Sequence, residues 1–131
     1  MDGSTPNRAV FAVTDIFFMS KIEAALPAAP GLEPVWLKPG EDLAEVCRGA
    51  RPGMVVVDLQ DPVLHPMQAV QALKAAGLPD CPKVIGFLPH VRMDLREAAN
   101  RAGVDQVLTR SAFTKLLPRL LAGETLTAGD S

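Results

Sequence analysis

The chain has 131 residues, 48% hydrophobic and only 5% aromatic, which is enough for one domain that buries roughly two-thirds of its unfolded surface. A formal net charge of −2 leaves no large basic patch, so we expect neither nucleic acid nor a membrane surface as a partner. No segment approaches the roughly 20 apolar residues of a membrane span.

The two cysteines, Cys47 and Cys81, are far apart in sequence and belong to no CxxC or His-Cys group. This spacing argues against a structural zinc site or a disulfide framework, and it favours a reducing compartment. Residues 1–7 are polar and lack the apolar segment of a signal peptide. We therefore expect a cytoplasmic protein.

Apolar runs alternate with helical periods five times along the chain. The first unit is a strand over residues 9–13 and a helix over residues 16–26, whose apolar side chains recur at helical spacing. A weaker strand over residues 34–38 precedes a helix over residues 43–50, and Cys47 falls on the apolar face of that helix. We therefore expect Cys47 in the core.

Three further units repeat the pattern of a short apolar run followed by a helix. The expected strands cover residues 54–59, 83–88 and 105–109, and the helical periods cover residues 69–76, 95–102 and 113–121. Ser111 is the expected N-cap of the last helix. We expect the domain to span residues 8–121, with tails at residues 1–7 and 122–131.

Five β-α units with right-handed crossovers predict an α/β fold, in which helices cover both faces of a five-stranded parallel sheet. At this size the expected strand order is 2-1-3-4-5, the flavodoxin-like order. That order brings the carboxyl ends of the first and third strands together at the functional edge of the sheet. We expect no output domain after residue 121, and we expect the chain to act alone or with a partner in trans.

Asp58 directly follows the three valines of the third strand, a run typical of a strand buried on both faces. The carboxylate could simply cap a turn, as Asp does in many such loops, and Asp61-Pro62 fits turn geometry. Thr14-Asp15 follows the first strand and should converge on Asp58. That convergence favours a functional pocket over a cap alone.

These residues resemble the receiver domain of two-component response regulators, and the resemblance covers about residues 8–121. The family has an acidic pair after the first strand, a phosphoacceptor aspartate after the third, Thr or Ser after the fourth and Lys-Pro after the fifth. The matching residues here are Thr14-Asp15, Asp58, Leu88 and Arg110-Ser111. Residues 58–62 also match the family's Asp-x-x-x-Pro loop, and Ala102-Gly103 matches its Ala-Gly turn before the fifth strand.

The resemblance implies a Mg²⁺ site formed by Asp15, Asp58 and the backbone carbonyl of Gln60. Thr14 puts a neutral hydroxyl where the family has a carboxylate. Hard divalent cations bind largely by charge and oxygen count, so we expect Mg²⁺ as a possible but weakly bound cofactor. Arg110 keeps the positive charge of the family's lysine, but on a longer stem with a planar head.

In the family, a Thr or Ser hydroxyl and an aromatic switch residue couple the phosphoryl group to the protein surface. Both positions are changed in this chain. Leu88 lacks the hydroxyl that contacts that group, and Val107 replaces the family's aromatic switch residue. We therefore interpret the chain as an atypical, degenerate receiver. His90 could contact an anion beside the pocket, although a plain turn role explains it better. Phe17 and Phe18 cannot both face the core, so one should be exposed near the pocket rim.

The resemblance and its departures leave two main functions open. In the first, a sensor histidine kinase phosphorylates Asp58 and the added charge alters a neighbouring surface. In the second, the chain is a pseudo-receiver that binds another signalling protein without phosphorylation. An enzyme or small-ligand binder is less favoured, because no Gly-rich phosphate loop or Ser-His-Asp order is present. The resemblance also makes a homodimer an open alternative.

Overall fold

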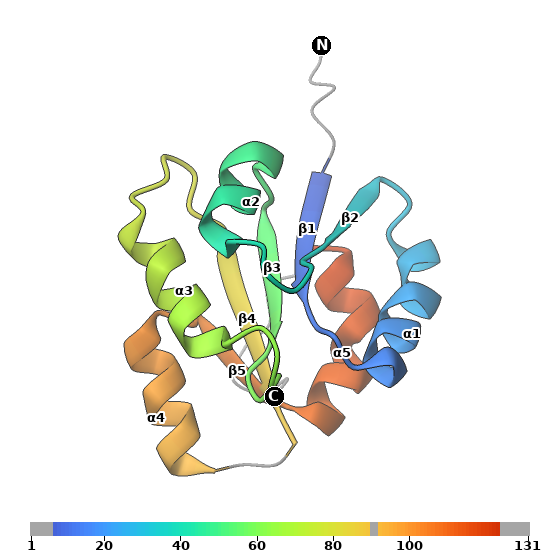
Figure 1. Cartoon of the computed structure of the whole chain (residues 1–131). Helices are drawn as coiled ribbons and strands as arrows, with labels where there is room; N and C mark the ends of the chain where they lie inside the picture. Colours follow the sequence, from blue (N-terminus) through green and yellow to red (C-terminus); the bar gives the residue numbers. More distant parts are fainter. Residues whose placement is uncertain (1–6, 90–91, 124–131) are drawn as a thin grey trace.

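A five-stranded parallel sheet in the order β2-β1-β3-β4-β5 forms the middle layer of the computed structural model, which describes residues 7–89 and 92–123 (Figure 1). The strands are β1 (Asn7–Ala12), β2 (Leu32–Trp36), β3 (Met54–Asp58), β4 (Lys83–Leu88) and β5 (Gln106–Thr109). The predicted order is confirmed. All strands run downward in Figure 1, so their carboxyl ends form one edge, called here the carboxyl edge.

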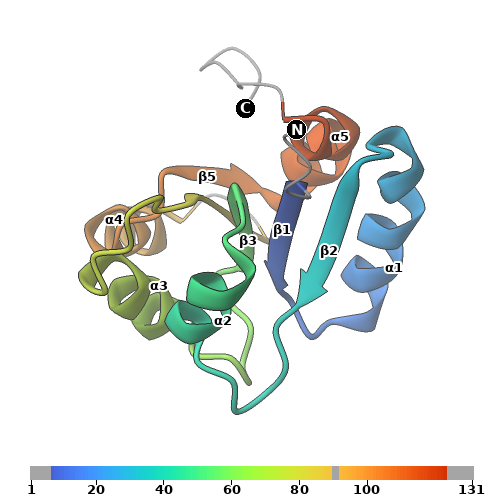
Figure 2. The same cartoon turned by 90° about the horizontal axis from the view of Figure 1, so that it is seen from above.

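Helices cover both faces of this sheet, as the sequence predicts. They are α1 (Ile16–Ala25), α2 (Leu43–Ala50), α3 (Pro66–Ala75), α4 (Met93–Ala102) and α5 (Arg110–Leu121), with a short 3₁₀ turn, η1 (Leu26–Ala28), after α1. Figure 2 shows α1 and α5 on one face and α2, α3 and α4 on the other. This is the flavodoxin-like α/β architecture.

The side chains of β3 supply apolar contacts to both faces of the sheet. Val55 and Val57 belong to the cluster under α2, α3 and α4, whereas Val56 belongs to the cluster under α1 and α5. All three valines are fully buried. The valine run therefore marks a strand covered on both sides, as predicted, and Cys47 is buried in the first cluster as expected.

The chain leaving β3 is anchored directly after Asp58. The Leu59 amide donates to the Phe87 carbonyl at 3.1 Å, and the Leu59 side chain lies over Gly86 of β4. A Cβ atom at Gly86 would stand 2.6 Å from Cδ1 of Leu59, so only glycine leaves room for this packing. The position of Asp58 is thus fixed by the residue that follows it.

The start of α5 differs from the prediction. Thr109 is its N-cap, because the Thr109 hydroxyl accepts a hydrogen bond from the Ala112 amide at 3.1 Å, and Ser111 lies inside the helix. The prediction of Ser111 as the cap was wrong because β5 runs into α5 without a connecting loop. Arg110 is therefore the first helical residue and is held at the carboxyl edge.

Helices α1 and α2 begin where the sequence predicts, whereas α3 and α4 begin two or three residues earlier than their apolar periods indicate. Helix α3 starts at Pro66, a residue suited to the first helical turn because it lacks the N–H that would be unpaired there. Most of the predicted tails and His90 lie outside the described residues, so the domain boundaries remain a prediction. None of the helices described is long and apolar enough to cross a membrane.

Candidate functional site

Asp58 ends β3 at the middle of the carboxyl edge, between β1 and β4, with 5% of its surface exposed. Its Oδ1 accepts a hydrogen bond from the Gln60 amide at 3.0 Å. Burial raises the pKa of the Asp58 carboxyl above its ordinary value. The Gln60 N–H and the positive charge of Arg110 oppose this shift, whereas the negative charge of Asp61 adds to it.

Asp61 is a second buried carboxylate, 4% exposed, and it connects two loops. Its Oδ2 accepts hydrogen bonds from the amide and the hydroxyl of Thr14 at 2.8 and 2.7 Å. Its Oδ1 accepts from the amides of Val63 and Leu64 at 2.9 and 3.1 Å. Burial alone would raise the pKa of Asp61, but these four bonds outweigh it and the pKa lies below the ordinary value.

The turn role predicted for Asp61 is confirmed by its bonds to Val63 and Leu64. The bond to Thr14 is an addition that sequence reasoning missed. The partners are 47 positions apart, and the only available signal was that both follow neighbouring strands of the predicted sheet. Thr14, interpreted from sequence as a lost carboxylate, is in fact the partner of a carboxylate on the next loop.

Asp15 is exposed and acts as the N-cap of α1. Its Oδ1 accepts from the amides of Phe17 and Phe18 at 2.8 and 3.4 Å. Within residues 7–89 and 92–123, no three His, Cys, Asp or Glu side chains lie close enough to hold a metal ion. The side chains as arranged therefore fit Mg²⁺ poorly, and the site predicted from Asp15, Asp58 and the Gln60 carbonyl remains a prediction.

Arg110 lies over an aromatic ring at the carboxyl edge. Its guanidinium carbon is 4.7 Å from the centre of the Phe18 ring, within the range of a cation–π contact. Arg110 makes no ion pair with Asp58, and its buried Nε has no hydrogen-bond partner in the described part of the chain. A buried donor without an acceptor costs about 1–3 kcal/mol. Arg110 is thus a cation whose Nε lacks an acceptor.

Four phenylalanines form a column beneath Arg110. Successive ring centres are 5.7 Å apart between Phe17 and Phe18, 5.1 Å between Phe18 and Phe87, and 4.4 Å between Phe87 and Phe113. Phe17 is 64% exposed and Phe18 is buried, which confirms that only one of the pair faces the core. The column joins α1, β4 and α5, so no local sequence pattern could predict it.

Leu88 at the end of β4 and Val107 inside β5 fill the core. Both are buried in the apolar cluster under α2, α3 and α4. A polar contact beside them comes from the Arg96 guanidinium, whose Nη2 donates to the Val107 carbonyl at 3.3 Å. The two positions that would carry the family's relay are therefore occupied by hydrocarbon packing.

Four large apolar side chains of the described residues are exposed, and all lie just after the carboxyl ends of strands. Ile16 and Phe17 begin α1, Val63 lies before α3, and Met93 begins α4. Their exposed fractions are 47–78%. We call these four residues the apolar rim.

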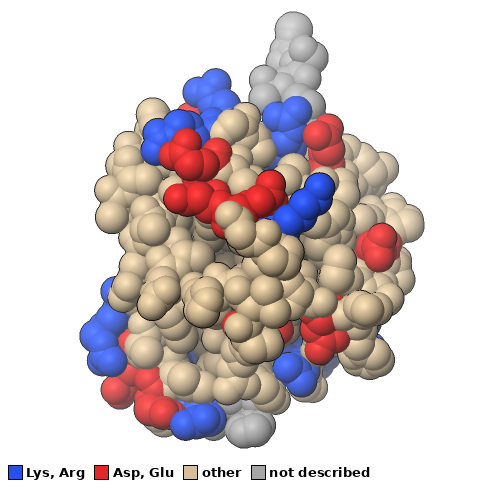
Figure 3. All heavy atoms as spheres, in the orientation of Figure 1, with Lys and Arg blue, Asp and Glu red and all other residues tan. Residues whose placement is uncertain are grey.

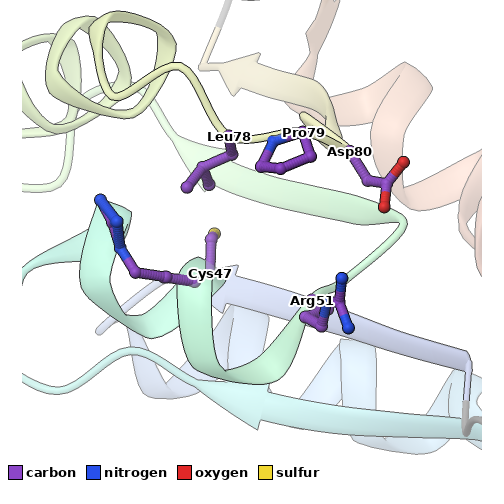
Figure 4. Close-up of a pocket in the computed structure, with 6 residues that line it drawn as sticks. Cys47, Arg51, Leu78, Pro79 and Asp80 are labelled. Atoms are coloured by element: carbon purple, nitrogen blue, oxygen red, sulfur yellow. The ribbon is translucent and has the colours of Figure 1, made fainter.

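A separate hollow of about 310 Å³ lies between α2 and the loop that precedes β4 (Figure 4). Its lining includes Cys47, Arg51, Leu78, Pro79 and Asp80. Burial raises the pKa of the Cys47 thiol to about 11, so the thiol stays protonated at neutral pH and is a poor nucleophile. The Cys47 thiol therefore does not make this hollow a candidate catalytic site.

The charge distribution agrees with the composition. Figure 3 shows acidic and basic side chains next to one another on the face seen in Figure 1, without a broad basic area. A single-sign surface able to hold nucleic acid is not visible on this face. The carboxyl edge, with its buried carboxylates and Arg110, remains the candidate site.

Comparison with known proteins identifies the fold. No protein-family model and no curated protein matches the chain. Among solved structures, the chain resembles the signal receiver domain of NarL from Mycobacterium tuberculosis, with a TM-score of 0.73 and 16% identity over 89% of this chain and 94% of that one. The chain therefore has the fold of response-regulator receiver domains.

Two further matches are structures with a divalent metal. One is the receiver domain of a sensor histidine kinase from Pseudomonas aeruginosa with magnesium in its active-site cleft, with a TM-score of 0.69 and 18% identity over 90% of this chain and 98% of that one. The other is a Mn²⁺-bound response regulator, with a TM-score of 0.67 and 19% identity over 93% and 98% of the two chains. Some proteins with this fold therefore bind a divalent metal.

Proposed function

We propose that the chain is an atypical receiver module of two-component signalling, in which Asp58 accepts a phosphoryl group from a sensor histidine kinase. The observation that carries this proposal is Arg110. It lies at the Asp58 pocket without an ion pair to that carboxylate, and its buried Nε lacks an acceptor among the described residues. A phosphoryl group on Asp58 would supply acceptor oxygens and negative charge at this point.

The transfer step would use the free oxygen of Asp58. Oδ1 is held by the Gln60 amide, and Oδ2 has no hydrogen-bond partner in the described chain. Oδ2 attacks phosphorus, the O–P bond of an acyl phosphate forms, and the P–N bond of phosphohistidine breaks with its electron pair returning to the imidazole. Arg110 stabilises the negative charge of the transferring group. The charge of Asp61 opposes that of the incoming group, so the rate should be modest.

Mg²⁺ would have a minor place in this proposal. Asp58 and the Gln60 carbonyl would supply oxygen ligands, and Asp15 could contribute only by leaving the α1 cap. A bound cation would screen the charge of the carboxylates. Because a ligand must first give up its hydrogen bonds, we expect weak binding.

The partner would contact the apolar rim. Ile16, Phe17, Val63 and Met93 surround the same edge as Asp58 in the chain's topology, so a protein that reaches Asp58 would cover them. Contact with a protein, not turnover of a small substrate, is the proposed activity. The partner is a sensor kinase or another signalling protein.

A second candidate is a pseudo-receiver that binds its partner without phosphorylation. The observation in its favour is the hydrocarbon packing at Leu88 and Val107, which leaves no hydroxyl or aromatic switch at these positions to report the state of Asp58. The raised pKa of Asp58 points the same way, because burial disfavours further charge there. In this alternative the unmodified carboxyl edge is the binding surface.

Intact-mass analysis separates the two candidates. The chain is incubated with phosphoramidate or acetyl phosphate and with candidate kinases, with and without Mg²⁺. The receiver function predicts a labile adduct of one phosphoryl group that is lost in Asp58→Asn and retained in Asp80→Asn, an exposed aspartate at the opposite edge of the sheet. No adduct under any of these conditions would contradict phosphorylation of Asp58 and leave the pseudo-receiver as the favoured candidate.

A further inference from the structure

The Thr14–Asp61 contact joins two loops beyond the point where the pairing of β1 and β3 in the sheet ends. The last paired residues of β1 and β3 are Ala12 and Val57. Beyond that pair, both the amide and the hydroxyl of Thr14 donate to Oδ2 of Asp61. The loop after β1 and the loop after β3 are thus held together by a buried carboxylate.

We propose that Thr14 and Asp61 form a metal-independent clamp, which gives this pocket its shape in place of a divalent cation. This proposal rests on the proposed function only for the location of the site at Asp58. The clamp joins the loop after β1 directly to the loop after β3 by hydrogen bonds. A cation shared by Asp15 and Asp58 would bridge the same two loops.

The hydrogen bonds of Asp61 leave it no room for a cation. Each oxygen accepts two bonds, all between 2.7 and 3.1 Å, and the side chain is 4% exposed. A carboxylate oxygen has about two lone-pair sites, so both oxygens of Asp61 are filled. Asp61 is therefore a positioning residue and not a metal ligand.

The remaining groups do not assemble a cation site around the clamp. The Asp15 carboxylate caps the N-terminus of α1, and Thr14 is neutral and donates a hydrogen bond from its hydroxyl to Asp61. Mg²⁺ requires near-octahedral oxygen ligands and usually one or two carboxylates. Among the described residues of these two loops, Asp58 is the one carboxylate that is neither a helix cap nor part of the clamp, and its Oδ1 already accepts from the Gln60 amide. The disagreement with the metal-bound neighbours follows from these hydrogen bonds.

The clamp also sets the position of Asp58. The Asp61 amide donates to the Asp58 carbonyl at 3.1 Å, so the two residues bracket one tight turn. The Thr14 end fixes that turn against β1, and Leu59 fixes it against β4. Asp58 is thereby held between two anchored neighbours without any ion.

The test moves the negative charge from one loop to the other. In the double variant Thr14→Asp/Asp61→Asn the net charge is unchanged. The amide side chain introduced at position 61 would keep an oxygen for the amides of Val63 and Leu64 and offer N–H donors to the new carboxylate. That carboxylate would stand beside Asp15. Mg²⁺ affinity is measured by isothermal titration calorimetry with MgCl₂ alone on the whole chain.

We expect the double variant to bind Mg²⁺ about tenfold more tightly than the parent chain, because a carboxylate replaces a hydroxyl at the loop after β1. Equal affinity of the two proteins would overturn the proposal. The single variants Thr14→Asp and Asp61→Asn should each unfold at a lower temperature than the double variant, because only the double variant pairs a carboxylate at position 14 with an amide donor at position 61. The position-14 N–H loses its acceptor in both proteins that carry Asp61→Asn. Additive changes would also overturn it.

A milder substitution covers the case in which the double variant fails to fold. Thr14→Val keeps the amide bond to Asp61 and removes only the hydroxyl bond, and we expect Tm to fall by about 5 °C. In the parent chain, Tm should be the same in millimolar Mg²⁺ and in EDTA. A parent Tm that falls in EDTA, or an unchanged Tm in Thr14→Val, would contradict the clamp. None of these measurements needs a phosphodonor, so failure here is distinct from failure of Asp58 phosphorylation.

Discussion

The carboxyl edge has two halves that differ in how their polar groups are satisfied. In the half formed by β1 and β3, the carboxylates of Asp15, Asp58 and Asp61 all accept hydrogen bonds from amides. In the half formed by β4 and β5, Leu88 is buried hydrocarbon and Arg110 has a buried donor without an acceptor in the described chain. The polar groups of the first half are held by hydrogen bonds, whereas under the proposed function the second half is where an incoming anion would find a free donor.

Under the proposed function, this difference places the phosphoacceptor Asp58 in one half and the residue that would respond to its phosphorylation, Arg110, in the other. Asp58 belongs to the rigid half, which favours a fixed orientation of its carboxylate. Arg110 belongs to the other half and is held by a ring contact, so it can move at little cost. Any effect of phosphorylation should therefore be transmitted through Arg110 and the phenylalanine column instead of through positions 88 and 107.

The largest expected effect comes from breaking the rigid half. Asp61→Ala removes four hydrogen bonds and leaves buried amides unpaired, so we expect the free energy of unfolding to fall by about 3 kcal/mol. Asp15→Ala, which removes one exposed helix cap, should cost about 1 kcal/mol. Urea unfolding of both variants gives the comparison. Equal losses would show that Asp61 has no special role.

A smaller loss should follow from disturbing the anchor after Asp58. Gly86→Ala places a methyl group within 2.6 Å of the Leu59 side chain, and we expect a loss of about 2 kcal/mol from the forced rearrangement. Gly49→Ala in α2 is the matched control, because no atom lies within 4 Å of its added Cβ. That control should be stabilising by about 0.5 to 1 kcal/mol. Equilibrium unfolding of the two variants measures both.

The two buried carboxylates should respond to pH with opposite signs. The pKa of Asp61 is lowered, so its ionised form stabilises the fold above the ordinary value of 3.8, and that contribution is lost as the pH falls through the lower native pKa. The pKa of Asp58 is raised, so it is the protonated form that stabilises the fold. That contribution is complete below pH 3.8 and is lost as the pH rises through the native pKa.

It follows that Asp58→Asn should be more stable than the parent chain at pH 7, because it removes a buried charge, and that this advantage should shrink below a pH of about 4. Asp61→Asn should be less stable than the parent at pH 7, and its deficit should shrink as the pH falls below 3.8 and through the lowered native pKa of Asp61. Thermal unfolding across this range tests both. A deficit in Asp58→Asn at pH 7 would mean that its carboxylate stabilises the fold.

The smallest effect on stability should come from the second half. Arg110→Met keeps an apolar stem over Phe18 and removes both the cation–π contact and the unpaired donor, so we expect a change below about 1 kcal/mol. The initial rate of phosphoryl adduct formation at Asp58 should nevertheless fall about tenfold, because the stabilising charge is gone. A large loss of stability in Arg110→Met with an unchanged rate of adduct formation would contradict the roles given to the two halves.

Much of the fold could be predicted because its signals are local. The valine run before Asp58 and the helical periods are short-range patterns, and the strand order then follows from parallel connections. The same reasoning predicted that Cys47 is buried and that one of Phe17 and Phe18 is exposed. The end of β3 therefore lies close to its predicted place.

The site was less predictable because its partners are distant in sequence. Asp61 was interpreted as a turn residue, since its local bonds to Val63 and Leu64 follow from sequence but its bond to Thr14 does not. The contact of Arg110 with Phe18 depends on how α5 packs against α1, which periodicity does not specify. Such contacts require the tertiary structure.

The central claim, that Asp58 is a phosphoacceptor whose charge is received by Arg110, is tested most directly by the ¹⁵N–Hε resonance of Arg110. We predict that this signal shifts when the ¹⁵N-labelled chain is treated with phosphoramidate, in step with the mass adduct, and that it does not shift in Asp58→Asn. An adduct that leaves the Arg110 resonance unmoved, or no adduct at all, would contradict the account.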